Sequence, residues 1–238
     1  MSNLSERELA ATIDHAILKP ELVRADVDAE LDIAAEWGVF SVCVRPSDIA
    51  YAVQRLDGTG VAVGTVIGFP HGTTSTAAKT AEVAQALADG ASEVDMVVNI
   101  GFLRSGFDDA VADDIRAVVS AAEGRIAKVI LETSYLDDEQ IARGSRLTEA
   151  GGAAFVKTST GFGGGGASVE HVRLMRASVG PAVQVKASGG VRNLATALAM
   201  IDAGATRLGT SAAATILGEA RAIERGDGPT GATDTASY

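Results

Sequence analysis

Apolar positions along the 238-residue chain alternate between short continuous runs and longer segments with helical spacing. Runs such as residues 39–44 and 93–99 are rich in valine and are bounded by turn residues, which indicates buried strands. Between the runs, apolar residues recur every three or four positions, and several of these segments end at glycine, as helices do. We expect strands at Ile13 and over residues 39–44, 61–67, 93–99, 127–132, 153–157, 182–186 and 206–209. We expect helices over residues 26–37, 48–56, 74–88, 108–122, 138–150, 169–179, 194–203 and 212–224.

An additional short helix is predicted over residues 6–11, because Ser5 and Glu8 have the spacing of a capping box. Eight strands, each followed by a helix, in a chain of this length predict a (β/α)8 TIM barrel with a short extra N-terminal helix. A doubly wound open sheet is the alternative, but no Gly-x-Gly-x-x-Gly follows the first strand. We expect one domain over residues 1–225 and a flexible tail, rich in Gly, Thr and Asp, over residues 226–238.

Composition narrows the class of protein. Apolar residues make up 47% of the chain and aromatic residues only 4%, so the core must consist of Ala, Val, Ile and Leu. The net charge of −11 disfavours nucleic acid and anionic membranes as partners, and an anionic substrate then requires a locally positive pocket. Cys43 is the only cysteine, and the chain has neither a signal-peptide pattern nor an uncharged stretch of membrane-spanning length. We therefore expect a cytoplasmic, soluble protein.

Two short apolar segments end on a lysine, Lys157 and Lys186, and then open into small polar residues and glycines. If both side chains face the mouth of a barrel, the two ammonium groups repel each other and are poorly solvated, which lowers the pKa of one of them. An uncharged lysine amine can attack a carbonyl and form a Schiff base. The alternative is a pair of ordinary surface lysines at strand ends, and the local pattern leaves both interpretations open.

Other polar residues occur where predicted strands end, and the carboxyl ends of barrel strands share one mouth. Asp95 lies inside an apolar strand, where it is either part of a working site or paired to a lysine in a structural salt bridge. Supporting polar residues at other strand ends are Asp14, Cys43, Asn99 and Glu132.

Small residues after the last three strands suit a phosphate site, because many barrels bind phosphate there with backbone N–H groups and helix N-termini. The candidates are Thr160, Gly161, Gly189, Gly190, Gly209 and Ser211. The histidines at positions 15, 71 and 171 are scattered and form no ligand pair, so we expect no metal and no cofactor. We interpret His15 as a strand-end hydrogen-bonding residue.

Several segments together resemble the deoxyribose-phosphate aldolases, a family of class I aldolases. The resemblance extends from about Leu4 to Glu224 in the order of the family, and its lysine motifs are highly specific. The matching segments are Ile13-Asp14-His15 with Leu18-Lys19-Pro20, Val42-Cys43-Val44-Arg45-Pro46, Val66-Ile67-Gly68-Phe69-Pro70-His71-Gly72, Glu93-Val94-Asp95-Met96-Val97, Lys128-Val129-Ile130-Leu131-Glu132-Thr133, Phe155-Val156-Lys157-Thr158-Ser159-Thr160-Gly161 and Val185-Lys186-Ala187-Ser188-Gly189-Gly190.

The resemblance implies reversible cleavage of 2-deoxy-D-ribose 5-phosphate to acetaldehyde and D-glyceraldehyde 3-phosphate, in deoxyribose catabolism. It also implies a homo-oligomer, either a dimer or a tetramer. The residues it assigns are Lys157 as the Schiff-base lysine, Lys186 as the lysine that lowers its pKa, Asp95 as the acid that shuttles protons with a bound water, Gly190, Gly209 and Ser211 as phosphate-loop positions, and Tyr238 as a C-terminal tyrosine that assists proton transfer. Ala16 and Ala212 depart from the family pattern, since a threonine and a second serine are common there.

Two other classes of function compete with an aldolase. An isomerase or epimerase would use paired carboxylates and would not need Lys157 as a nucleophile. A sugar-phosphate-binding or regulatory protein would bind the ligand without releasing acetaldehyde.

Overall fold

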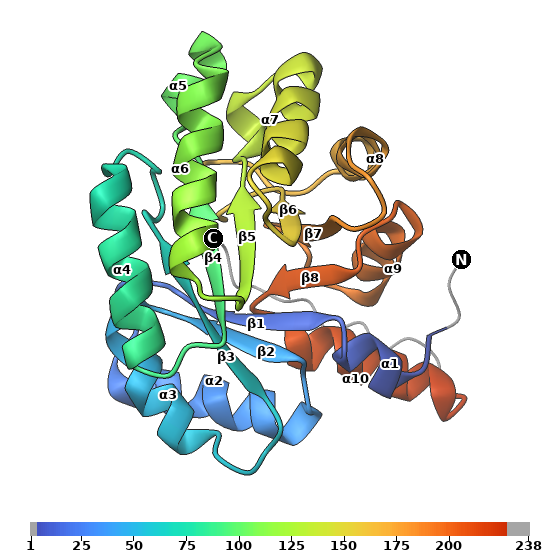
Figure 1. The fold of residues 1–238 in the computed structure, drawn as a ribbon. Coiled ribbons are helices and arrows are strands. Elements are labelled where there is room, and N and C mark those ends of the chain that lie inside the picture. Colours follow the sequence, from blue (N-terminus) through green and yellow to red (C-terminus); the bar gives the residue numbers. More distant parts are fainter. Residues whose placement is uncertain (1–3, 228–238) are drawn as a thin grey trace.

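The strands of the chain close into a barrel in sequential order, β1-β2-β3-β4-β5-β6-β7-β8 (Figure 1). The computed structural model describes residues 4–227. All neighbouring strands are parallel, and β1 pairs with both β2 and β8, so the sheet is closed and the open-sheet alternative is wrong. The strands are β1 (Ile13–Ile17), β2 (Ser41–Val44), β3 (Ala62–Ile67), β4 (Glu93–Val97), β5 (Ile126–Ile130), β6 (Phe155–Lys157), β7 (Gln184–Ser188) and β8 (Arg207–Thr210). The predicted (β/α)8 barrel is confirmed.

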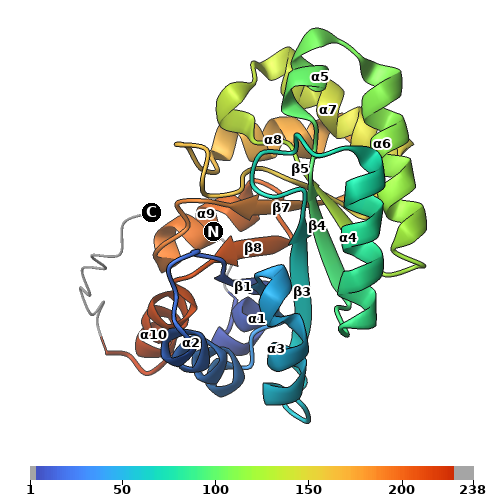
Figure 2. The same ribbon diagram turned by 90° about the vertical axis from the view of Figure 1, so that its left-hand side faces the viewer.

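Helices surround the outer face of the barrel (Figures 1 and 2). They are α1 (Glu6–Ala10), α2 (Arg24–Trp37), α3 (Ile49–Arg55), α4 (Thr76–Ala88), α5 (Ile100–Ser105), α6 (Asp108–Ala121), α7 (Asp138–Ala150), α8 (Val169–Ser178), α9 (Leu194–Asp202) and α10 (Ala213–Glu224), with 3-10 turns η1 (Pro46–Asp48) and η2 (Thr133–Tyr135). The predicted capping box of Ser5 and Glu8 starts α1. This helix lies beside α10, where Glu6 and Arg221 form an ion pair of 2.6 Å.

The differences from the sequence prediction that matter for the site concern β7 and the segment after β4. β7 extends to Ser188, so Lys186 lies in the middle of its strand and not at the end; Gly189 and Gly190, both with positive φ, end the strand instead. β4 stops at Val97, and a short helix, α5, follows. We did not predict α5, because six residues that include a glycine are too few for a helical pattern to appear.

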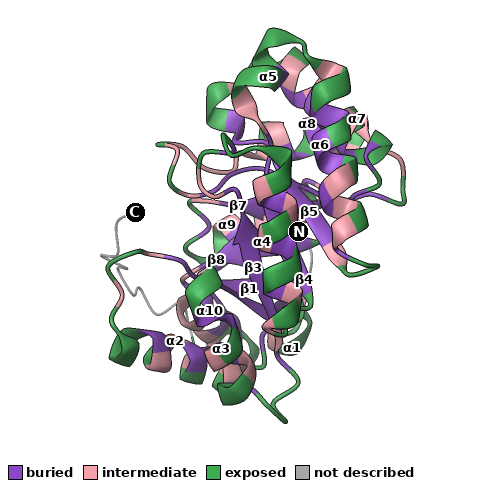
Figure 3. Cartoon of the chain, turned by 60° about the vertical axis from the view of Figure 1, so that its left-hand side comes forward, coloured by how far each residue is buried: buried purple, intermediate pink, exposed green. Residues whose placement is uncertain are grey.

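The apolar core lies between the sheet and the helices. Outward-facing strand residues such as Val94, Met96 and Val129 pack there with the buried faces of the helices in one large cluster. In Figure 3 the strands are buried, while the helices are exposed on their outer sides. The expected core of Ala, Val, Ile and Leu is confirmed for this layer.

Several inward-facing residues of the barrel are charged, although interiors of this fold are usually filled by branched apolar side chains. Because side chains alternate along a strand, Glu93 and Asp95 of β4 both point inward while Val94 points outward. A small apolar cluster of Leu18, Cys43 and Val66, with Ala16 and Phe69 packed against it, lies on this side of the sheet. The buried charged residues that point inward are Asp14, Glu93, Asp95, Lys128, Lys157, Lys186 and Arg207. The fold thus creates a charged interior that opens at one end.

Candidate active site

Lys157 is the last residue of β6, and its side chain is buried inside the barrel. Its Nζ donates a hydrogen bond of 2.8 Å to Oδ2 of Asp95. Burial lowers the pKa of the Lys157 amine, and Lys186 lowers it further, while Asp95 acts in the opposite direction. The net effect is a lysine that gives up its proton more readily than a lysine in water.

Lys186 occupies the position on β7 that pairs with Lys157 in the register of the two strands. Its Nζ lies 2.5 Å from Asp14 Oδ2 and 2.8 Å from Asp95 Oδ2. Although burial opposes the charged form, these two carboxylates raise the pKa of Lys186 above its ordinary value. Lys186 is therefore a fixed cation beside Lys157, and the two lysines of the sequence analysis lie together in the barrel.

Asp95 joins three lysines. Its Oδ2 accepts from Lys157 and Lys186, and its Oδ1 accepts from Lys128 Nζ at 2.8 Å. Burial raises the pKa of the carboxyl group, but the three ammonium groups outweigh burial and hold it well below 3.8. The sequence analysis left open whether Asp95 is part of a working site or pairs with a lysine in a salt bridge. In the structure Asp95 forms salt bridges, and its partners include the two lysines of the candidate site.

Sequence analysis missed three of the buried charged residues, Lys128, Glu93 and Arg207. Lys128 contacts Asp95 and Glu93, and Arg207 contacts Asp14. A signal was available, because each of the three stands in a short apolar strand at an inward position. A charge there needs a partner of opposite sign, and the interior of the barrel supplies one.

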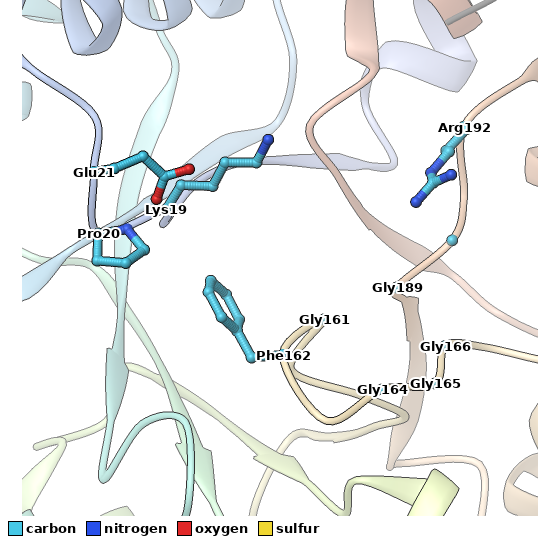
Figure 4. A pocket seen from close by; sticks show the side chains of 11 residues that line it. Lys19, Pro20, Glu21, Gly161, Phe162, Gly164, Gly165, Gly166, Gly189 and Arg192 are labelled. Carbon is cyan, nitrogen blue, oxygen red and sulfur yellow. The ribbon is translucent and has the colours of Figure 1, made fainter. Parts of the chain in front are cut away.

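A narrow cavity of about 40 Å³ reaches the two lysines from the mouth of the barrel. It continues into a wider opening of about 580 Å³ (Figure 4). Lys19, Pro20 and Glu21 lie on one side of the opening, Arg192 lies on the other, and the ring of Phe162 points into the space between them. Both cavities share Gly161, Phe162, Gly189, Gly190 and Arg192, so they form one path from the surface to Lys157.

The predicted phosphate-loop residues all line the inner cavity: Thr160, Gly161, Gly189, Gly190, Gly209 and Ser211. Gly161, Gly189 and Gly190 have positive φ, which glycine adopts without strain. Two of the loops touch, since a Cβ on Gly166 would lie 2.4 Å from the carbonyl oxygen of Gly189. Helix α10 begins just after Ser211, and its N-cap residue, Ala212, makes no side-chain capping bond. Backbone N–H groups at this end of the cavity suit an anionic group.

Glu132 and Thr160 form hydrogen bonds that hold the loop after β6 in place. The hydroxyl and the backbone N–H of Thr160 both donate to Glu132 Oε2, and the hydroxyl accepts from the N–H of Phe162. Burial raises the pKa of Glu132, although the bonds from Thr160 oppose this. The sequence analysis placed Glu132 and Asn99 together as supporting polar residues at strand ends. Asn99 instead caps α5, accepting from the N–H of Phe102 at 3.1 Å.

The remaining candidates lie as follows. Asp14 accepts from Ser41, Lys186 and Arg207, and its neighbouring cations hold its pKa well below 3.8 against the effect of burial. Cys43 lines the inner cavity as a free thiol, whose pKa burial raises to about 11. His15 contacts Glu30 at 2.6 Å, as a hydrogen-bonding residue. Tyr238 lies outside the described residues.

Two further findings concern residues 4–227 only. No three His, Cys, Asp or Glu side chains in this range form a group that could hold a metal ion. Its helices include none with the length and apolar character needed to cross a membrane.

Comparison with known proteins gives consistent matches. The model of the DeoC/LacD family of aldolases matches residues 9–218. Deoxyribose-phosphate aldolase 2 of Staphylococcus aureus (strain MRSA252) is 53% identical over 208 residues, which are 87% of this chain and 94% of that protein. Deoxyribose-phosphate aldolase of Staphylococcus haemolyticus (strain JCSC1435) is 52% identical over 208 residues, with the same coverage of 87% and 94%. The tetrameric deoxyribose phosphate aldolase of Aeropyrum pernix superposes with a TM-score of 0.85 at 31% identity, covering 92% of this chain and 93% of that chain.

Proposed function

Because this chain belongs to the DeoC/LacD family of aldolases, we propose that it cleaves 2-deoxy-D-ribose 5-phosphate reversibly to acetaldehyde and D-glyceraldehyde 3-phosphate. The observation that carries the proposal is the environment of Lys157. Its amine is buried at the inner end of a cavity and has a lowered pKa. It contacts the carboxylate of Asp95, which the cation Lys186 also contacts. These are the conditions under which a lysine forms a Schiff base at neutral pH.

The reaction begins with the uncharged Lys157 amine attacking the C1 aldehyde of the ring-opened sugar. Loss of water gives an iminium ion, which withdraws electrons from the C2–C3 bond. When that bond breaks, its electron pair forms an enamine on Lys157, and glyceraldehyde 3-phosphate leaves. Protonation of the enamine and hydrolysis then release acetaldehyde and restore the amine.

Asp95 takes the proton of the C3 hydroxyl through a water molecule as the bond breaks. Because neighbouring lysines hold the pKa of Asp95 well below 3.8, its side chain is an ionised carboxylate that can accept a proton from this water. General acid–base help of this kind contributes about 10²–10⁴ in rate.

The phosphate group lies toward the loops that end at Gly190 and Ser211, near the first turn of α10. Its charge is attracted by backbone N–H groups and by Arg192 at the mouth. Binding energy from this remote group aligns C1 with Lys157, so a substrate without phosphate loses turnover as well as affinity.

Acetaldehyde and borohydride treatment, followed by intact-mass and peptide mapping, tests the role of Lys157. We expect a single reduced adduct on Lys157, and Lys157→Leu to abolish both this adduct and acetaldehyde release in a coupled NADH assay. An adduct mapped to Lys186 would reverse the two lysine assignments. Isomerisation without any adduct would favour carboxylate chemistry, and binding without acetaldehyde release would favour a binding protein.

We further propose that the protein is a cytoplasmic homo-oligomer, a dimer or a tetramer. The tetrameric relative from Aeropyrum pernix and the absence of any possible intrachain disulfide support this. Sedimentation analysis should give a mass of at least twice 24.2 kDa; a monomer at micromolar concentration would refute the oligomer.

A further inference from the structure

Glu93 and Arg207 form a layer beneath the catalytic lysines that the proposed reaction does not use. They are the first residues of β4 and β8, so they lie at the end of the barrel opposite the cavity. Arg207 Nη1 donates to Asp14 Oδ1 at 2.6 Å and lies 3.5 Å from Glu93 Oε2. Glu93 Oε2 in turn lies 2.5 Å from Lys128 Nζ. All four side chains are buried.

These contacts close into a ring of six groups with alternating charge. Two branches leave Arg207 and meet on Asp95, one through Asp14 and Lys186 and the other through Glu93 and Lys128. In order around the ring, the groups are Arg207, Asp14, Lys186, Asp95, Lys128 and Glu93. Three positive and three negative charges cancel. Lys157 is attached to Asp95 as a seventh group outside this balance.

A net charge is costly in a buried, poorly polarisable region, because no water solvates it. With Lys157 uncharged, the seven groups sum to zero; with Lys157 protonated, they sum to plus one. The ring therefore favours the uncharged amine. Loss of a cation from the ring weakens this preference, and loss of an anion strengthens it.

We propose that Arg207 and Glu93 are positioning residues which act in opposite directions on the charge balance of this ring and thereby set how readily the amine of Lys157 gives up its proton for Schiff-base formation. The inference rests on the proposed function, because it assigns these two residues a part in preparing the same lysine. Neither residue touches substrate; both act through the carboxylates and lysines above them.

Phe40 completes the arrangement at the closed end of the barrel. The centre of its ring lies 3.5 Å from the guanidinium carbon of Arg207, and the centre of the Phe155 ring lies 5.3 Å from the same carbon. Phe40 itself is 37% exposed, so it separates the guanidinium from water. A dry guanidinium acts on its neighbours more strongly than a solvated one.

The charged and titratable groups around Lys157 come from most strands of the barrel. Asp95, Lys186 and Cys43 affect its pKa directly, Lys157 in turn acts on the carboxyl group of Glu132, and Lys128 contacts the other oxygen of Asp95. Arg192 and Lys19 line the path to solvent. Within the described residues, Arg207 and Glu93 are the ring members that touch neither Asp95 nor the cavity, so their charge can be changed without altering the direct contacts of Lys157.

The test measures how readily Lys157 is trapped by acetaldehyde and cyanoborohydride as a function of pH, with the adduct quantified by peptide mapping. The acid limb of the profile is the pH range over which trapping rises as the Lys157 amine loses its proton. Arg207→Met leaves the ring at minus one, which favours the ammonium, so we expect this limb to move up by about one pH unit. Glu93→Gln leaves the ring at plus one and should move the limb down. The double variant restores the balance and should return the limb to within a few tenths of a unit of the unmodified protein.

Arg207→Lys keeps the charge and should behave as the unmodified protein does. Arg221→Met is the matched control, because Arg221 also lies over an aromatic ring, that of Trp37 at 4.0 Å, but outside the barrel; its limb should not move. If the barrel-end variants fail to fold, Phe40→Ala is the substitute. It removes a partly exposed cover over Arg207 and should move the limb up by less than about one pH unit, and an unmoved limb would count against the proposal.

Identical acid limbs in all folded variants, or equal shifts in the two single variants and a larger one in the double variant, would overturn the charge-balance proposal. The trapping assay does not depend on cleavage of the sugar phosphate. A protein that traps acetaldehyde with the expected shifts but releases none from deoxyribose 5-phosphate therefore refutes the proposed function and leaves the ring in place. Cleavage with unshifted limbs does the reverse.

Discussion

Asp95 has two tasks, since it pairs with the buried lysines and relays a proton during cleavage. Asp95→Asn separates the two effects, because it removes the charge and keeps the shape. Asp95 accepts three bonds of 2.8 Å from Lys128, Lys157 and Lys186. Without its charge the cations are less well paired, and breaking a buried ion pair costs about 3–5 kcal/mol. The cost should fall near the lower bound, because Lys157 relieves part of the excess by giving up its proton.

Asp95 is the group that raises the pKa of Lys157 against burial and Lys186, so the Asn variant should lower that pKa further. Each unit gives about tenfold more uncharged amine on the acid side of the titration. Trapping of acetaldehyde at pH 6 should therefore increase relative to the unmodified protein. Sugar-phosphate cleavage should nevertheless decrease by about 10²–10⁴, because the proton relay is lost.

The assay compares trapping with cleavage in the same preparation, after circular dichroism has shown that the variant is folded. Asp114→Asn is the matched control, since Asp114 also pairs with a buried lysine, Lys79 at 2.6 Å, but outside the barrel. It should cost comparable stability and leave the pH dependence of trapping unchanged. If trapping and cleavage decrease in parallel in Asp95→Asn, or if the acid limb of trapping moves up, the reasoning is wrong.

Two further predictions follow from contacts at the site. Gly209→Ala places a Cβ 2.7 Å from Ser188 Cβ and 3.1 Å from Lys186 Cε. We therefore expect the free energy of unfolding, measured by thermal unfolding, to fall by about 1–3 kcal/mol and turnover to decrease. The control is Gly218→Ala on α10, which has no contact closer than 3.9 Å and should be neutral or stabilising. Asp14 has a folded-state pKa below its ordinary value of 3.8, so its contribution to stability is complete above that pH and is lost as the pH falls through the folded-state value. Denaturant titrations should give a constant free energy of unfolding between pH 7 and about pH 5 and a decline below about pH 4, and a decline that begins near pH 6 would contradict this.

The barrel itself could be predicted from the sequence because each outward strand face is apolar and each helix has its own periodic pattern. The outward-facing residues Val94 and Val129 indicate strands even though charged residues occupy the inward positions next to them. Lys157, Lys186 and Asp95 could also be found, because each is a charged residue in an apolar strand, and the two lysines are followed by small residues and glycines. Their proximity followed from the closure of the barrel alone.

The charge ring could not be predicted, because a sequence does not state which inward position meets which. Arg207 and Asp14 are far apart along the chain, and only the register of β8 with β1 brings them together. The role of Asn99 was also beyond the pattern, since an asparagine that ends a strand and one that caps a helix have the same appearance until the helix is known.

The bond between Asp14 and Lys186 spans 172 residues of sequence, and that between Asp14 and Arg207 spans 193. The charged ring is therefore complete only when β1, β7 and β8 are all part of the barrel. In an unfolded chain the side chain of Lys157 is in water, where it has the pKa of an ordinary lysine and is almost entirely an ammonium at neutral pH. The reactive amine is therefore a property of the closed barrel and not of the β6 segment alone.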